Sequence, residues 1–165
     1  MDTFLMTPLG HQKLEEKLQQ LRNVERYAIV KDIEEARAHG DISENSEYED
    51  AKERQAMCEG MIQDLEAKLS RAQVIDVSTL DGVDLPDDSD EKAVVFGSTV
   101  VVEDADGEEH TFRIVGTDES DITKGWISYQ TPVAKALLGR SPGDDVSIVL
   151  PLMTKEYEIL TVSYR

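Results

Sequence analysis

The chain has 165 residues, of which 32% are charged and 5% are aromatic, a composition that suits a small domain beside an extended element better than one large core. Its 17 basic and 35 acidic side chains give a formal net charge of −18, which disfavours a broad nucleic-acid-binding face because phosphates would be repelled. The single cysteine, Cys58, excludes an intrachain disulfide, and no apolar run approaches the roughly 18 residues of a membrane span.

A long helix is predicted from Pro8 to His39. Thr7 is a suitable N-cap, Pro8 suits the first helical position, and Gly40 can take the left-handed conformation that ends a helix. Most residues between these ends are strong helix formers. Apolar residues recur at spacings of three and four, with an interruption at the pair 25–26: Leu14, Leu18, Leu21, Ile29, Ile33 and Ala36.

A second helix is predicted from about Asn45 to Ala72. It carries a heptad seam of mostly apolar residues: Ala51, Gln55, Cys58, Ile62, Leu65, Leu69 and Ala72. Two helices of similar length with a short connection fold back antiparallel. At 1.5 Å per residue, we expect a projecting hairpin roughly 45 Å long.

After Ala72 the pattern changes to short β-branched runs separated by turn signals, which predicts strands. Asp104 to Gly107 is a predicted hairpin loop, because Asp-Gly readily takes the positive φ that such turns need. Residues 133–138 form a predicted short helix, and residues 81–91 an acidic loop. The predicted strands are Val94–Phe96, Thr99–Val102, Thr111–Val115, Trp126–Tyr129, Val146–Leu150 and Tyr157–Val162.

Two carboxylates, Asp41 and Glu44, lie in the connection between the two helices. Side chains three residues apart share one face of a helical backbone, so this pair could hold a hard cation such as Mg²⁺. The same spacing fits a capping box, with Asp41 as N-cap and Glu44 at the third helical position. Ser43 and Asn45 are also competent caps, so both interpretations stay open.

A self-sufficient enzyme is not predicted. A helix N-terminus repels cations, so the acidic pair alone should hold metal weakly. His39 has no partners at zinc-ligand spacing and suits the C-terminal end of a helix. The sequence contains no nucleophilic triad order and no phosphate-binding loop. Arg37, Lys52 and Arg54 flank the far end of the hairpin, where they could meet RNA or simply pair with nearby carboxylates.

With these features laid out, the chain resembles the bacterial transcript-cleavage factors of the GreA/GreB family, and among them the GreA type. The resemblance covers nearly the whole chain. Its most specific stretch is residues 33–48, IEEARAHGDISENSEY, followed by residues 58–62 and 65–69. A second signature is residues 127–139, ISYQTPVAKALLG.

The resemblance implies an α+β fold, in which an N-terminal antiparallel coiled-coil hairpin is followed by a β-sheet domain with a short helix, similar to the FK506-binding fold. We expect the arm at residues 1–75, an acidic linker at 76–92 and the globular domain at 93–165. The implied function is that of a cytoplasmic elongation factor, with no membrane contact and no catalysis of its own. Such a factor stimulates RNA polymerase to cleave backtracked RNA.

The resemblance also assigns roles to residues. Asp41 and Glu44 would share a Mg²⁺ ion with the polymerase in two-metal hydrolysis, while the isolated protein binds none tightly. Near the 3′ end of the RNA would lie Arg37, Lys52, Arg54 and Asn45, the last orienting water. The docking loop would be Gln130, Thr131 and Pro132, placed against the coiled coil of the largest polymerase subunit at the rim of the secondary channel. Thr131 stands where the family has Ser.

Three other functions remain as alternatives. A family member can occupy the polymerase channel as an inhibitor, although such members differ at the acidic pair. A peptidyl-prolyl isomerase is suggested by the expected fold alone, which is weak evidence for activity. It would need an aromatic-lined pocket drawn from Phe96, Phe112, Trp126, Tyr129, Tyr157 and Tyr164. The third alternative is a coiled-coil adaptor.

Overall fold

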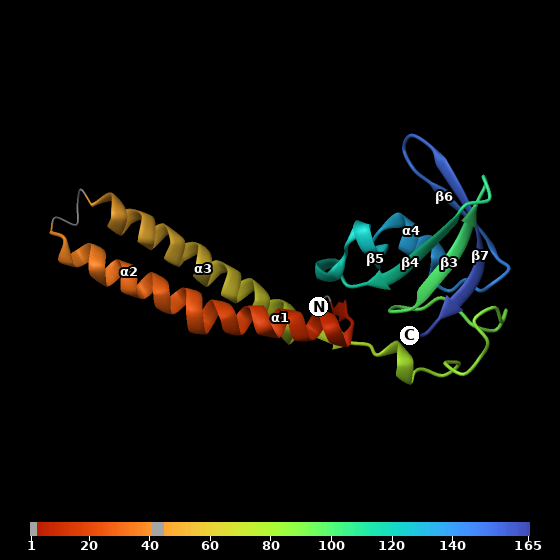
Figure 1. Cartoon of the computed structure of the whole chain (residues 1–165), viewed down its shortest axis with the longest axis horizontal. Helices are drawn as coiled ribbons and strands as arrows, with labels where there is room; N and C mark the ends of the chain where they lie inside the picture. Colours follow the sequence, from red (N-terminus) through yellow and green to blue (C-terminus); the bar gives the residue numbers. More distant parts are fainter. Residues whose placement is uncertain (1–2, 41–44) are drawn as a thin grey trace. The chain divides into compact units, whose positions relative to one another are not determined.

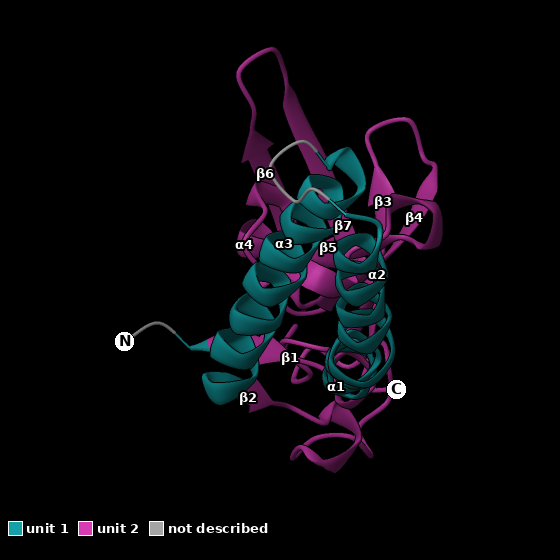
Figure 2. Ribbon diagram, turned by 90° about the vertical axis from the view of Figure 1, so that its left-hand side faces the viewer, with its two compact units in different colours: residues 1–3, 11–72 teal, residues 4–10, 73–165 magenta. Residues whose placement is uncertain are grey.

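A computed structural model describes residues 3–40 and 45–165 (Figure 1). The chain forms two compact units (Figure 2). Unit 1 runs from His11 to Ala72, and unit 2 joins residues 4–10 to residues 73–165. The N-terminal segment Phe4–Gly10 therefore belongs to the same unit as the C-terminal half of the chain.

Unit 1 is a helical hairpin. Its first arm comprises α1 (Pro8–Gln20, whose first turn lies in unit 2), the π-helical turn η1 (Leu21–Glu25) and α2 (Arg26–Ala38), and its second arm is α3 (Ser46–Ser70). Arg22 pairs with Glu66, Arg26 with Glu59, and Asp32 with Arg54, so the two arms run antiparallel. Eight residues of the predicted seams form one buried cluster, against which the partly buried Leu14 and Leu69 pack: Leu18, Leu21, Ile29, Ile33, Ala51, Cys58, Ile62 and Leu65. The predicted seam position Ala72 lies beyond the end of α3.

The interruption of the first seam has a structural cause. Leu21 and Ile29 are eight positions apart, one more than a heptad, yet both are buried in the same cluster. The π-helical turn absorbs the extra residue, since the backbone N–H of Arg26 bonds to the carbonyl of Leu21, five positions earlier. The prediction of one continuous α-helix from 8 to 39 was therefore wrong between Leu21 and Glu25.

Unit 2 contains a five-stranded sheet in the order β5-β4-β3-β7-β6. All neighbours are antiparallel except β4 and β5. The strands are β3 (Thr99–Asp104), β4 (Glu109–Val115), β5 (Trp126–Ser128), β6 (Asp145–Val149) and β7 (Thr154–Ser163). The short helix α4 (Pro132–Leu137) packs on one face of this sheet through Ala134 and Leu137, which are fully buried with Val100, Ile114 and Val162.

Smaller elements complete unit 2. The 3₁₀ turns are η3 (Val77–Thr79), η4 (Thr117–Glu119) and η5 (Ile122–Lys124). A two-stranded sheet joins β1 (Phe4–Met6) to β2 (Ala72–Val74), and neither of these strands was predicted.

The predicted strand at Val94–Phe96 was wrong. The segment is buried but not in a ladder, because Val94 exchanges both backbone hydrogen bonds with residues that follow α4: its N–H donates to Arg140 O at 2.7 Å and its carbonyl accepts from Gly139 N at 2.9 Å. The predicted hairpin loop is confirmed, with Gly107 at φ +81°.

The acidic segment before this region is held by Lys92. Lys92 is only 2% exposed, and its ammonium donates to Leu85 O and to the carboxylate of Asp87, each at 3.1 Å. Burial of a charged group is tolerated here because the charge is paired.

In the described part of the chain, no helix is long and apolar enough to span a membrane.

Candidate functional site

The second arm of the hairpin begins at Asn45, which is the N-cap of α3. Its Oδ1 accepts a hydrogen bond from Tyr48 N at 3.1 Å, and its Nδ2 donates to the carbonyl of Ala36 at the end of α2, at 2.6 Å. One side chain thus caps α3 and adds a second hydrogen bond to the Ala36 carbonyl, which also accepts from His39 N at 3.3 Å. The capping-box interpretation, with Asp41 as the cap of this helix, was therefore wrong.

Asp41 and Glu44 themselves lie outside the described residues. On the sequence, they fall between Gly40, which has φ +116°, and the Asn45 cap. A positive φ of this kind is accessible to glycine at little cost. Among the described residues that flank this segment in sequence, the Nδ1 atom of His39 lies 3.3 Å from the Glu47 carboxylate, and both side chains are exposed.

The three basic side chains predicted near this end differ in their contacts. The Arg37 guanidinium lies over the Tyr48 ring, 5.7 Å from its centroid, and Lys52 Nζ donates to Gln55 Oε1 at 3.0 Å. Arg54 is 2.8 Å from Asp32 on the opposite arm. Within residues 3–40 and 45–165, the ion pairs of the hairpin include Arg54 but neither Arg37 nor Lys52.

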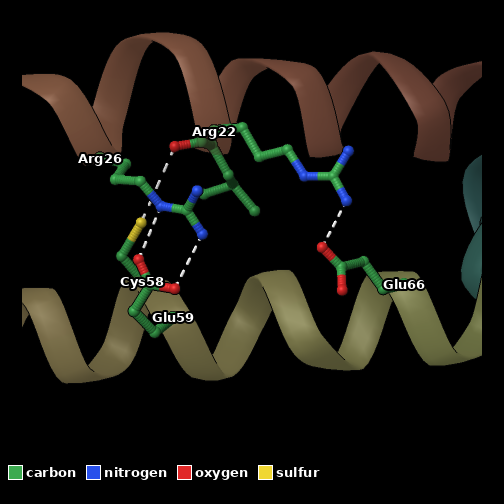
Figure 3. Close-up of polar contacts among 6 residues, drawn as sticks. Arg22, Arg26, Cys58, Glu59 and Glu66 are labelled. Carbon is green, nitrogen blue, oxygen red and sulfur yellow. Dashed lines mark hydrogen bonds and ion pairs between the residues drawn. The ribbon is translucent and has the colours of Figure 1, made fainter.

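Farther from the connection between the helices, two ion pairs join the arms, and we call them the clamps (Figure 3). Arg26 donates two hydrogen bonds to the Glu59 carboxylate, at 2.7 and 2.8 Å, and Arg22 pairs with Glu66. The Glu59 carboxylate raises the pKa of Arg26, mainly through these hydrogen bonds. Beside the Arg26–Glu59 pair, the Cys58 thiol approaches the Leu21 carbonyl at 3.9 Å. No pattern in the sequence indicated these cross-arm pairings.

The predicted docking loop is the turn between β5 and α4. Thr131 is the N-cap of α4: its Oγ1 accepts from Ala134 N at 3.3 Å and donates to Ser128 O at 2.8 Å. Pro132 occupies the first turn of the helix and is exposed, as is Gln130, whose Oε1 accepts from Thr117 Oγ1 at 3.3 Å. A serine hydroxyl could make both bonds of Thr131, so the exchange of Ser for Thr leaves the cap intact.

A second group of ligand-type side chains lies in the β3–β4 hairpin. Asp104, Glu108 and His110 bring ligand atoms within 4.8 Å of one another. Asp104 also accepts from the backbone N–H groups of Asp106 and Glu108, and the His110 hydrogen bond is the main cause that lowers the Asp104 pKa. These bonds close the hairpin loop, and they account for the cluster without a metal.

One residue that the sequence analysis missed is Glu119, in η4. Its carboxylate accepts hydrogen bonds from Thr7 at the start of α1 and from the backbone of Gly116. It lies 112 positions from Thr7 in sequence. No local pattern connects positions so far apart.

Comparison with known proteins accounts for both halves of the chain. Residues 4–74 match the family model described as "Transcription elongation factor, N-terminal", and residues 89–164 match "Transcription elongation factor, GreA/GreB, C-term". The chain belongs to the GreA/GreB family. The predicted family and the α+β fold class are thus confirmed.

Individual GreA/GreB relatives match over their whole length. The transcription elongation factor GreA of Thermodesulfovibrio yellowstonii is 48% identical over 165 residues, covering 99% of each chain. That of Hyphomonas neptunium is 45% identical over 166 residues, covering 100% of each. Among solved structures, GreA factor homolog 1 of Thermus thermophilus shares 27% identity, with a TM-score of 0.42 and coverage of 98% of this chain and 99% of that one.

Proposed function

We propose that this protein is a transcription elongation factor that stimulates RNA polymerase to cleave backtracked RNA, and that it acts as an accessory factor rather than as an enzyme. The observation that carries the proposal is the match of both parts of the chain to the GreA/GreB family. The polymerase supplies the catalytic centre, and this protein adds Asp41 and Glu44.

The chemistry of this pair fits a shared Mg²⁺ ion. Carboxylate oxygens are the ligands that Mg²⁺ prefers, and two of them leave room for further ligands from another protein. Bound in this way, the ion would activate water or steady the leaving oxygen in hydrolysis of a phosphodiester. Asn45 is committed to capping α3 and to Ala36, so its role would be to fix the start of the helix next to Glu44.

Arg37 and Lys52 support contact with the 3′ portion of the RNA. Both are exposed near the end of the hairpin, and within the described residues neither is ion-paired. Tyr48 beneath the Arg37 guanidinium offers a ring face close by. Arg54 contributes less, because its charge is compensated by Asp32.

Docking on RNA polymerase would use the turn of Gln130, Thr131 and Pro132. The Thr131 cap and the Gln130 bond to Thr117 hold this turn before any partner binds, which reduces the entropy lost on docking. The coiled coil at the rim of the polymerase's secondary channel is the partner surface that we propose.

The test uses stalled elongation complexes with Asp41→Asn and Glu44→Gln variants. We expect each to bind polymerase like the unaltered protein, while stimulated cleavage falls by about two orders of magnitude, since a shared cation supplies several kcal/mol of transition-state stabilisation. The control is Glu35→Gln, an exposed carboxylate of α2. Loss of binding in both variants, or undiminished cleavage, would overturn the assignment of the acidic pair.

Two alternatives give different results in the same assays. An inhibitor would bind the complex and slow both elongation and cleavage. A peptidyl-prolyl isomerase would act on a model proline peptide, and we expect no activity, because Phe96, Tyr157 and Tyr164 are buried in the core of unit 2.

A further inference from the structure

The N-terminus of α1 has an incomplete capping box. In a complete box, the N-cap hydroxyl accepts from the backbone N–H three residues later, and a Glu at that third position accepts from the N-cap N–H. Here Thr7 Oγ1 accepts from Gly10 N at 3.1 Å, which is the first half of the motif. Position 10 is glycine, so the second half has no local carboxylate.

Glu119 supplies the missing carboxylate. Its Oε2 accepts from the backbone N–H of Thr7 at 3.1 Å, and its Oε1 accepts from the Thr7 hydroxyl. The same Oε2 accepts from Gly116 N at 3.0 Å, at the start of η4. One carboxylate therefore caps both α1 and η4, and Thr7 is buried at 3% exposure beneath it.

Two glycines, Gly10 and Gly116, leave room for the Glu119 carboxylate and for the neighbouring backbone. A Cβ atom at Gly10 would lie 2.1 Å from Glu119 Cδ, so position 10 admits no side chain while Glu119 occupies the site. A Cβ atom at Gly116 would lie 2.7 Å from the carbonyl oxygen of Leu5 in β1. Residues 4–10 are thus fitted closely against η4 within unit 2.

We propose that Glu119 is a positioning residue, whose carboxylate fixes the first turn of α1 to unit 2 and thereby supports stimulated RNA cleavage. This inference rests on the proposed function. Helix α1 begins in unit 2 and continues into unit 1. Motion of its first turn would therefore move the first arm of the hairpin, because the helix is continuous. Sharing a metal ion with another protein demands close placement of the carboxylates that bind it.

The test compares Glu119→Ala with Glu119→Gln in the full chain. Glutamine keeps an oxygen for the two N–H groups, and its amide N–H can donate to Thr7 Oγ1 in place of the bond that the hydroxyl now donates, whereas alanine removes all three contacts. For Glu119→Ala we expect the cleavage rate at saturating protein to fall about tenfold or more, since small misplacements of reacting groups cost that much. The half-saturating concentration should not change, and Glu119→Gln should stay near the unaltered protein. Glu109→Ala, an exposed carboxylate of β4, is the matched control.

A double variant separates positioning from simple helix capping. Gly10→Glu in the Glu119→Ala background restores an ordinary capping box within α1 but not the link to η4. We expect the thermal midpoint to be higher in the double variant than in Glu119→Ala alone, while the cleavage rate stays as low as in Glu119→Ala.

Three results would overturn the inference. These are recovery of cleavage in the double variant, an unchanged rate in Glu119→Ala, or a loss explained wholly by weaker binding. Failure of the proposed function is distinguishable, because the unaltered protein itself would then stimulate no cleavage.

Discussion

At the scale of single residues, the hairpin depends on a few side chains that join its arms. Cys58 is one of these, at 5% exposure, and it lies beside the Arg26–Glu59 pair (Figure 3). Burial raises the pKa of its thiol, so the reactive thiolate is disfavoured. Its role is to fill the seam.

We therefore expect the Cys58 thiol to be protected in the folded protein. An aromatic disulfide reagent should modify it slowly under native conditions and quickly in denaturant, because reaction requires the arms to open. The absorbance of the released thiolate measures both rates. A native rate equal to that of a free cysteine peptide would contradict the buried position.

Single residues also show where sequence reasoning reaches its limit. Three candidates for the cap of α3 stood within five positions, and spacing could not choose among them. Asn45 is the cap in the structure, and its amide also reaches Ala36 O, nine positions away. Glu119 shows the limit of sequence reasoning more clearly, since its partner Thr7 lies 112 positions away in the chain. Contacts of this kind depend on the assembled fold.

At the scale of elements, the heptad seams predicted the hairpin because burial of one face requires that periodicity. The sequence shows that the first seam is interrupted at residues 25–26, but it does not show the structural cause of that interruption. An extra residue can be absorbed by a π-helical turn, by a kink or by loss of packing beyond it. The structure shows the first, because Leu21 and Ile29 are both buried.

This explanation predicts the effect of a deletion. Removing Val24, which is 51% exposed in η1, shortens the Leu21–Ile29 spacing to a heptad, so a regular α-helix would keep the whole seam buried. We expect helix content and thermal midpoint to be unchanged or raised, as measured by circular dichroism.

The control deletion is Gln63, an exposed residue of the uninterrupted helix α3. Its loss turns the residues beyond it by about 100° relative to the seam, which should cost at least about 2 kcal/mol through exposure of Leu65 and Leu69. Equal destabilisation by both deletions would show that the extra residue in η1 is needed for packing.

At the scale of the whole molecule, the dominant feature is the net charge of −18. Like charges repel more strongly in the compact folded state than in the expanded chain, so the excess of carboxylates opposes folding at neutral pH. Only some carboxylates are compensated locally. Asp104 has its pKa lowered by the His110 hydrogen bond, and Asp121 has its pKa lowered mainly by the Thr123 hydroxyl.

The general repulsion and the lowered pKa values of Asp104 and Asp121 together predict how the thermal midpoint responds to salt and to acid. At neutral pH, adding sodium chloride up to about 0.15 M should raise the thermal midpoint, because it shortens the range of the repulsion to about 8 Å. Mild acidification should also raise it by lowering the net charge. Carboxyls with a lowered pKa stabilise the fold above their unfolded-state pKa of about 3.9 and lose that contribution as the pH falls through the folded-state value.

Stability should therefore pass through a maximum on the acid side of neutrality and fall below about pH 4. Calorimetry across pH at two salt concentrations would measure this, and chloride is preferred because sulfate strengthens apolar burial directly. The variant Asp104→Asn should flatten the acid limb, whereas Asp106→Asn, in the same hairpin loop, is the matched control. A thermal midpoint that falls with added chloride at neutral pH would mean that attractive ion pairs such as Arg26–Glu59 outweigh the general repulsion.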